Sequence, residues 1–414
     1  MPKNGPIRPL PLPQKLMPFE PPRIALVTGG LPLGGSTTFL CNFAGELRRR
    51  KMAVEVFSFE KGNALAAVFD VQKISVFCQD ERRLIFEDRL RAILEKLRDF
   101  QPSVVLANLG SVSFEAFRYL PPGIFRAGIC HTDHPRERNM IAPYAAHLDL
   151  LAAVSQKIFR ELSAHPQFKN VSLKHLSLGV GVPGEAGVRR CNLHGPLQIL
   201  YLGRLEREQK RAHLFPQIFE QLKASGISFH WTMAGEGPEQ AVLEQALKSA
   251  PQQTVSFPGK ISYAQVPELM KAHDIFLLAS DYEGLPLSLL EAMGHGLVPV
   301  VSNLPSGIPE VVDTSTGVLV PVNDVAGYAR GIIHLHQHRD ELAAKSAVAR
   351  ERVKTEFSVE AMTDRWLAVF PKNAAAVGEW PSRWNIRAPL PARHPVQFSR
   401  PLRALRRLAS KFRQ

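Results

Sequence analysis

The chain has 414 residues, of which 45% are hydrophobic, and it carries a formal charge of +13 at pH 7. Residues 371–414 hold ten Lys and Arg against the single acid Glu379, so this segment supplies most of the basic excess. The rest of the chain is only mildly basic, which argues against a nucleic-acid-binding protein, and no nucleic-acid partner is expected.

Residues 1–22 are rich in proline and are expected to form an extended or disordered lead. They lack the unbroken apolar run of a signal peptide, and no segment approaches the 18 consecutive apolar residues that a membrane span needs. The four cysteines lie far apart with no CxxC pair, which predicts neither a zinc site nor a disulfide framework. These features favour a reduced, cytoplasmic setting.

Residues 23–178 alternate short aliphatic runs with segments of helical period. The predicted strands are 23–28, 53–58, 74–77, 103–108, 126–131 and 150–155, and the clearest helices are 39–50 and 81–100. Strands that read as continuous apolar runs are buried on both faces and need crossover helices between them. This half is therefore predicted to be a doubly wound parallel α/β domain.

A segment rich in glycine and proline, 179–196, interrupts this alternation and is predicted to be a linker. Residues 197–355 then repeat the pattern, with strands at 197–203, 227–235, 254–259, 274–280 and 297–302 and helices at about 210–224, 237–249, 264–272, 286–295 and 325–338. Two such domains leave a central cleft. Ligands of parallel α/β sheets bind beyond the carboxyl ends of the strands, so we expect the site in that cleft.

Two further helical segments follow, and the second lies within residues 356–370, before the basic tail at 371–414. In FSRPLRALRRLASKFR (398–413), apolar residues fall on one helical face and most arginines elsewhere. Such a basic amphipathic helix can rest on an anionic membrane. The alternative is a solvated or disordered tail.

The first strand is followed by TGGLPLGGSTTF, in which Gly34 and Gly35 precede an apolar helix. Glycines let the backbone approach a ligand, and the free N–H groups at a helix start suit phosphate. The motif matches neither the dinucleotide fingerprint nor the P-loop. A tight turn with Ser/Thr capping is an equal alternative.

Three basic residues follow strands of the second half. Arg204 ends the 197–203 strand, Lys210 comes six residues later, and Lys260 leaves the 254–259 strand. A guanidinium fork and a mobile ammonium group suit a diphosphate. The alternative is that these charges belong to solvated faces.

The stretch DYEGLPLSLLE holds two glutamates eight residues apart. Glu283 is expected in the turn before a helix, and Glu291 roughly 7–8 Å down that helix. Glu283 could then address the reactive end of a ligand and Glu291 a pair of ribose hydroxyls. The backbone N–H groups of Gly284, Leu285 and Leu287 could hold phosphate. The alternative is a capping acid and an exposed helix acid.

The string EGLPLSLLEAMGHGLVPVVSNLPSGIPEVV resembles the E-x7-E signature region of glycosyltransferase family 4, which are retaining enzymes of the two-domain GT-B fold. GRLEREQKR, MAGEGPE, VSFPGKIS, SGIPEVVD and GVLVPVND follow in the order of that family, and the resemblance spans about residues 23–370. It implies a GT-B architecture: two doubly wound Rossmann-like domains that face a central cleft, the first on the acceptor side and the second on the donor side.

The resemblance also implies roles for the residues singled out above. Arg204 and Lys210 would bind the donor diphosphate, Glu291 its ribose and Glu283 the transferred sugar. His131, in ICHTDHPRE, matches the position of an active-site histidine near the sugar and acceptor, although a lone histidine at a strand end is more often structural. The chain departs from the family where GGSTT replaces an acidic glycine-rich loop and where Arg211 replaces a common glycine.

The function implied is that of a retaining hexosyltransferase, which moves a sugar from a UDP- or GDP-sugar to a glycan, lipid-linked or small-molecule acceptor. Bacterial cell-surface glycan biosynthesis is the expected setting. The chain has no DxD motif, so no metal and no cofactor is expected. Contact of residues 398–413 with the inner face of the membrane would suit a lipid-linked acceptor. Two alternatives stay open: a nucleotide-sugar 2-epimerase of the same architecture and a non-catalytic nucleotide-sugar-binding protein.

Overall fold

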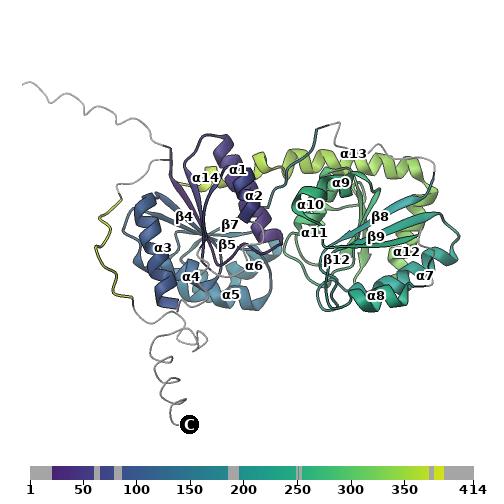
Figure 1. Ribbon diagram of the computed structural model, residues 1–414, viewed down its shortest axis with the longest axis horizontal. Helices are drawn as coiled ribbons and strands as arrows, with labels where there is room; N and C mark the ends of the chain where they lie inside the picture. Colours follow the sequence, from purple (N-terminus) through teal and green to yellow (C-terminus); the bar gives the residue numbers. More distant parts are fainter. Residues whose placement is uncertain are drawn as a thin grey trace, which may run out of the picture.

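The computed structural model describes residues 21–59, 66–78, 86–184, 195–248, 250, 254–372 and 377–386. Two α/β domains lie side by side, and helices cover both faces of each sheet (Figure 1). Every strand pairing within the two sheets is parallel.

The first domain is built on seven strands in the order β3-β2-β1-β4-β5-β6-β7. All five residues of the central strand β1 are buried, as its continuous aliphatic run predicts. The strands are β1 (Ile24–Thr28), β2 (Val54–Ser58), β3 (Ser75–Cys78), β4 (Val104–Leu109), β5 (Phe125–Cys130), β6 (Leu150–Ala153) and β7 (Ser172–His175). The helices are α1 (Gly35–Arg49), α2 (Ala66–Val71), α3 (Phe86–Phe100), α4 (Ser111–Glu115), α5 (Pro135–Ile141) and α6 (Gln156–Ala164), with short 3-10 helices η1 (Ala116–Tyr119), η2 (Ala142–His147) and η3 (Pro166–Phe168).

The second domain is built on six strands in the order β10-β9-β8-β11-β12-β13. Its strands are β8 (Leu197–Leu202), β9 (Phe229–Ala234), β10 (Val255–Gly259), β11 (Ile275–Leu278), β12 (Val298–Asn303) and β13 (Val318–Pro321). Its helices are α7 (Phe215–Ala224), α8 (Gln240–Ala246), α9 (Val266–Lys271), α10 (Leu287–Gly294), α11 (Ile308–Val311) and α12 (Val325–Gln337), with 3-10 helices η5 (Ala212–Leu214) and η6 (Tyr263–Gln265). Both sheets are doubly wound, which confirms the predicted fold class.

Several local features differ from the sequence prediction. The edge strands β7 and β13 are absent from it. Ser172–His175 alternates in burial and lacks an apolar run, and β13 has only four residues. Helix α1 begins at Gly35, ahead of the predicted start at residue 39, so the glycine-rich loop forms its N-terminus. Helix α10 begins at Leu287, and Pro286 is its N-cap rather than part of its first turn.

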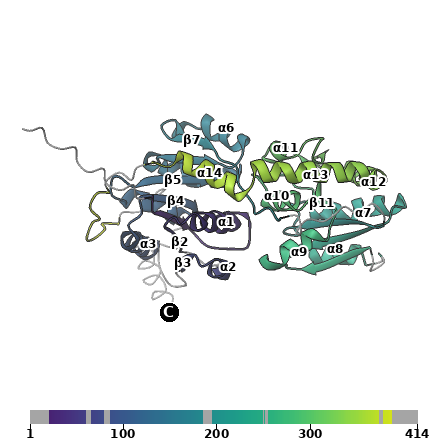
Figure 2. The same cartoon turned by 90° about the horizontal axis from the view of Figure 1, so that it is seen from above.

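The last two helices connect the domains. Helix α13 (Arg339–Glu356) lies along the second domain, and α14 (Val359–Val369) lies on the first (Figure 2). Trp366 of α14 is fully buried, with its ring centroid 6.1 Å from that of Phe39 and 5.7 Å from that of Phe43, both on α1. Burying a large apolar side chain contributes about 3 kcal/mol, so this contact holds the end of the second domain against the first.

The beginning of the basic tail also packs on the first domain. Trp384 is only 7% exposed, and Trp380 Nε1 donates a hydrogen bond to Gln101 Oε1 at 3.1 Å. Residues 377–386 are therefore anchored to the first domain by two tryptophans. The amphipathic segment 398–413 and residues 1–20 lie outside the described residues.

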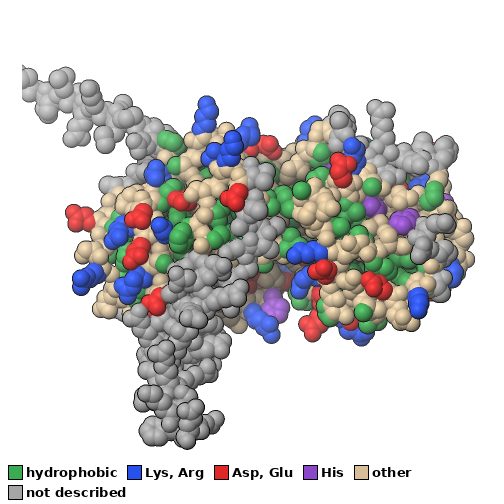
Figure 3. Space-filling model, in the orientation of Figure 1, with side chains coloured by type: hydrophobic (Ala, Val, Ile, Leu, Met, Phe, Trp, Pro, Cys, Tyr) green, Lys and Arg blue, Asp and Glu red, His purple; other side chains and the backbone are tan. Residues whose placement is uncertain are grey.

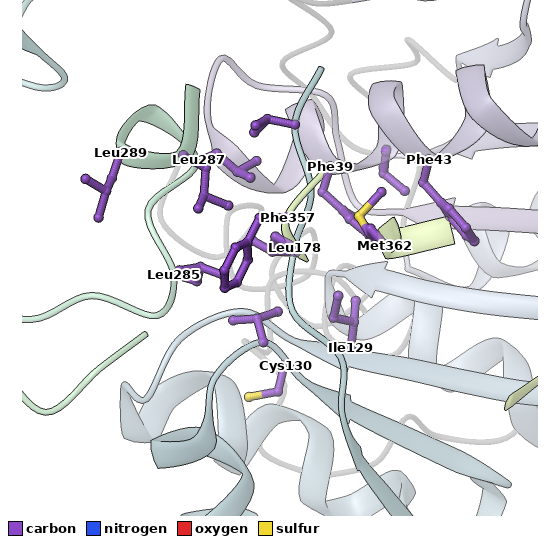
Figure 4. Close-up of a cluster of buried hydrophobic side chains, with 14 of the residues drawn as sticks. Phe39, Phe43, Ile129, Cys130, Leu178, Leu285, Leu287, Leu289, Phe357 and Met362 are labelled. Carbon is purple, nitrogen blue, oxygen red and sulfur yellow. The ribbon is translucent and has the colours of Figure 1, made fainter. Parts of the chain in front are cut away.

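A cluster of hydrophobic side chains fills the junction of the two domains. Figure 4 shows Leu285 and Leu287, which come from the second domain, close to Leu178 and Phe357. All four are buried. The hydrophobic core therefore continues from one domain into the other and fixes their relative position at this point.

The described surface carries acidic and basic side chains interspersed on the face that Figure 3 presents. Among the described residues, none of the helices is both long and apolar enough to span a bilayer.

Candidate active site

A cleft of about 570 Å³ lies between the domains, at the carboxyl ends of strands from both sheets. It brings together all of the residues that the sequence singles out for the donor site and the chemistry. These are Gly34, Gly35, His131, Arg204, Lys210, Lys260, Glu283, Gly284, Leu285, Leu287 and Glu291. The architecture thus places them on one ligand-sized cavity, as expected for parallel α/β sheets.

A buried ion pair lies at the centre of the cleft. The carboxylate of Glu283, 6% exposed, accepts hydrogen bonds from Lys210 Nζ at 2.5 Å and from Ser280 Oγ at 2.7 Å. Gln209 Nε2 donates to its other oxygen at 3.4 Å. Because an ammonium group has three N–H donors, Lys210 keeps donors for a ligand while it holds Glu283 in place.

The loop between β8 and η5 carries the two cations and is folded around Glu206. This carboxylate accepts hydrogen bonds from the backbone N–H groups of Lys210 at 2.7 Å and Gln209 at 3.0 Å. The guanidinium of Arg204 is exposed and donates to Gln209 Oε1 at 2.7 Å. Arg204 and Lys210 therefore reach the same side of the cleft, with most guanidinium donors still available.

Arg211, which stands where the family often has glycine, adopts a left-handed backbone conformation with φ 52° and ψ 32°. That conformation costs a non-glycine residue about 1 kcal/mol, which explains why glycine suits this position. Its guanidinium pairs with Asp281 Oδ1 at 3.0 Å, and Asp281 N donates to Gln209 O at 2.8 Å. These contacts join the loop that carries Lys210 to the loop that carries Glu283.

The N-termini of α1 and α10 meet across the cleft. A methyl group at Gly35 would lie 3.8 Å from Leu287 Cδ1, and both residues line the cavity. The first N–H groups of a helix have no acceptor within the helix and carry partial positive charge. Neither helix has an acidic residue in its first turn. This end of the cleft therefore favours an anion.

Glu291 lies deep in the cleft, in the second turn of α10. Burial raises the pKa of its carboxyl group from 4.5 to about 7, and within the described residues no hydrogen bond or ion pair to the carboxylate is present. Nearby, Tyr263 lines the same cavity and donates from its hydroxyl to Asn42 Oδ1 at 3.3 Å, which links the domains. Glu291 is thus a half-buried acceptor without a protein donor among the described residues.

His131 contributes from the first domain, at the end of β5. Its ring packs edge-on against Phe39, and burial lowers the pKa of the imidazole to about 4, so the ring is neutral. The backbone N–H groups of His131 and Thr132 donate to the Glu137 carboxylate at 3.0 and 2.9 Å, which fixes the loop. His134 instead caps α5 by accepting from Arg136 N at 3.1 Å.

The two domains are in close contact at Gly284. A Cβ atom built there would lie 1.9 Å from the carbonyl oxygen of His131, so only glycine permits this contact. On the other side of the interface, Glu310 of α11 accepts from Gln156 N at 2.7 Å and lies 3.2 Å from His175 Nε2. These contacts hold His131 beside the loop that carries Glu283.

Several residues around the cleft are absent from the sequence prediction: Glu206, Gln209, Tyr263 and Ser280. Gln209 and Tyr263 act through contacts with segments that are distant in sequence, whereas Glu206 and Ser280 act within their own loops. No local sequence pattern distinguishes any of them. Among the described residues, no group of three or more His, Cys, Asp or Glu is arranged to hold a metal ion, and the three described cysteines form no disulfide.

The sequence of the second domain is similar to a known family. Residues 196–338 match the family described as glycosyl transferases group 1. Over 172 residues the chain is 37% identical to the putative colanic acid biosynthesis glycosyltransferase WcaL of Escherichia coli K12, which covers 39% of this chain and 42% of that protein. The chain thus spans about two fifths of the length of the curated relatives that it matches first.

Solved structures resemble nearly the whole described chain. A structure of S. aureus TarM with UDP superimposes with a TM-score of 0.69 at 12% identity, covering 84% of this chain and 99% of that one. Anabaena Alr3699/HepE in complex with UDP-glucose gives 0.68 at 16% identity, covering 84% and 98%. This likeness identifies the fold as GT-B, as the sequence predicts.

Proposed function

We propose that the protein is a retaining glycosyltransferase that moves a sugar from a UDP- or GDP-sugar to a sugar or lipid-linked acceptor. One observation carries the proposal: Lys210 paired with Glu283, the exposed guanidinium of Arg204 and two uncompensated helix N-termini converge on one cleft. The similarity to a protein named for colanic acid biosynthesis and to a structure that holds UDP-glucose supports a nucleotide-sugar donor.

In the proposed reaction, the bond between the anomeric carbon and the leaving phosphate oxygen breaks. The acceptor oxygen bonds to the same carbon from the same face of the ring, and the acceptor proton passes to the departing phosphate oxygen. Negative charge grows on the diphosphate, where Arg204, Lys210 and the first N–H groups of α10 stabilise it. We therefore expect transfer to proceed without a metal ion.

In this proposal the two glutamates bind different parts of the donor. Glu291 accepts hydrogen bonds from the ribose diol, which supplies the donors that its half-buried carboxylate lacks in the protein. Glu283, fixed by Lys210 and Ser280, accepts from a hydroxyl of the transferred sugar. His131 lies beside the sugar and the acceptor, on the side of the first domain.

The donor site is tested by thermal shift and calorimetry with UDP, GDP, ADP and their common sugar conjugates, with and without EDTA. We expect one nucleotide to bind in the presence of EDTA and to bind about tenfold or more weakly to Arg204→Ala and Glu291→Ala, since each removes a hydrogen bond to a charged group. Arg207→Ala is the control, because Arg207 is 64% exposed on the same loop and does not line the cleft. Equal binding by all variants would refute the site.

The reaction is tested with a labelled donor of that nucleotide. NMR of the product should give the same anomeric configuration as the donor. An inverted product would refute retention, and release of an epimerised nucleotide sugar would favour the 2-epimerase. A lipid-linked acceptor would in addition require activity on vesicles, where the basic sequence of residues 398–413 suits an anionic surface.

A further inference from the structure

Asn108 is a buried polar residue that the sequence analysis gives no role. It lies in β4, is 1% exposed and does not line the cleft. Its amide lies between the glycine-rich loop and the active-site histidine. Nδ2 is 3.3 Å from Ser36 O and 3.4 Å from Thr28 Oγ1, and Oδ1 is 2.6 Å from His131 Nε2.

The neighbours of Asn108 determine which way its amide points. The backbone carbonyl of Ser36 can only accept a hydrogen bond. The Thr28 hydroxyl donates its single proton to Gly30 O at 3.1 Å, so toward Asn108 it also acts as an acceptor. Both groups therefore face the NH₂ side of the amide, and the carbonyl oxygen Oδ1 is left facing His131.

This orientation fixes the position of the proton on His131. A carbonyl oxygen has no proton to donate, so the short contact requires an N–H at Nε2 of His131. In the neutral ring, Nδ1 then carries a free lone pair and is an acceptor. The hydrogen bonds of one buried amide thus select one of the two tautomers.

We propose that Asn108 is a positioning residue, which holds His131 as the Nε2–H tautomer and ties its ring to the glycine-rich loop through Ser36. The inference rests on the proposed function for its consequence, which is that Nδ1 of His131 accepts a hydrogen bond from a hydroxyl of the sugar or the acceptor. Ser36 lies in the first turn of α1, at the anion end of the cleft. Asn108 therefore couples the phosphate side of the site to the histidine side.

The test uses the full chain with Asn108→Asp and Asn108→Leu, which keep the size of the side chain. Ser113→Ala is the control, because it removes a different buried hydrogen bond, 2.7 Å to Leu109 O, close to the end of the same strand. Long-range ¹H–¹⁵N NMR reports the tautomer and the protonation of each histidine ring. Signals of His131 are assigned by their loss in His131→Ala.

In wild type and Ser113→Ala, His131 is expected to stay neutral with its proton on Nε2 from pH 5 to 8. Asn108→Asp should make the ring charge within this range, because a carboxylate at this position favours the imidazolium. Asn108→Leu should give a mixture of tautomers, because the acceptor for Nε2–H is lost. Both variants should lower kcat by about 100-fold with little change in the donor KM, as expected when a reacting group is misplaced.

An unchanged tautomer and titration of His131 in both variants would overturn the inference, whatever the activity. If Asn108→Leu does not fold, the NMR titration of His131 in Asn108→Asp is sufficient to test the inference. A shifted tautomer together with wild-type kcat in His131→Ala would support the positioning role and refute the role of His131 in transfer. The NMR result and the kinetic result therefore test the two proposals separately.

Discussion

Glu291→Gln is expected to stabilise the protein, by an amount that grows as the pH rises from 4.5 to 7. The pKa of Glu291 is about 7 in the fold and 4.5 as its ordinary value. The folded state therefore holds this proton where the unfolded state has released it, and stability falls as the pH rises from 4.5 to 7. At about 1.4 kcal/mol for each pH unit, the full cost is about 3 kcal/mol above pH 7 and less than about 1 kcal/mol at pH 5.

Glutamine has nearly the same shape and never ionises, so the variant avoids this cost. We expect its melting temperature to exceed that of wild type by about 5–10 °C at pH 8 and by little at pH 5. Glu220→Gln is the control, since it changes an exposed glutamate of α7 that does not line the cleft. An equal gain for Glu291→Gln at both pH values would refute the reasoning, because a change in packing does not depend on pH.

Nucleotide binding should lower the raised pKa of Glu291. A ribose diol donates hydrogen bonds to the ionised carboxylate of Glu291, so the bound nucleotide lowers the pKa of that group. At pH 6, binding should then release close to one proton. Calorimetry in two buffers of different ionisation enthalpy measures the release, which should vanish in Glu291→Gln.

Lys210→Ala is expected to destabilise the fold by about 3 kcal/mol in urea titrations, because the buried carboxylate of Glu283 loses its cation; an unchanged midpoint would contradict this. Gly284→Ala places a methyl group 1.9 Å from His131 O, so the domains have to separate. Transfer should fall at least about 100-fold while nucleotide binding changes much less, and full activity would show that the contact is dispensable. Arg211→Gly relieves a left-handed backbone strain of about 1 kcal/mol and loses the ion pair with Asp281, which contributes at most about 1 kcal/mol. Because the two effects oppose each other, the melting temperature of the variant should stay within about 3 °C of wild type.

The fold was predictable because its determinants are local. Continuous aliphatic runs such as residues 23–28 and 197–203 can only be strands buried on both faces, and the helical segments between them require parallel crossovers. The edge strand at 172–175 could not be predicted in this way, because half of it faces solvent and it has no continuous apolar run. The contact of Trp384 with the first domain could not be predicted either, since no sequence pattern in the proline-rich tail indicates where this tryptophan packs.

The candidate site was predictable only in part, for a similar reason. Gly34, Arg204 and Glu283 lie in loops that follow strands, and the carboxyl ends of parallel strands all lie along the same edge of a sheet. Asn108 and Gln209 act through contacts between segments that are 23 to 80 residues apart in sequence. Only the three-dimensional structure shows that Asn108 holds the ring of His131 and that Gln209 joins Arg204 to the Glu283 loop.

The geometry at Gly284 makes the proposed chemistry depend on contact between the domains. Lys210, Glu283 and Glu291 all come from the second domain, so in the proposed function that domain supplies the contacts to the diphosphate and the ribose. His131 and its partner Asn108 come from the first, and the carbonyl of His131 packs against Gly284. In the proposed reaction, His131 is therefore beside the sugar only while the domains are in contact. Donor binding and sugar transfer are therefore separable steps, and a variant that parts the domains should keep the first while it loses the second.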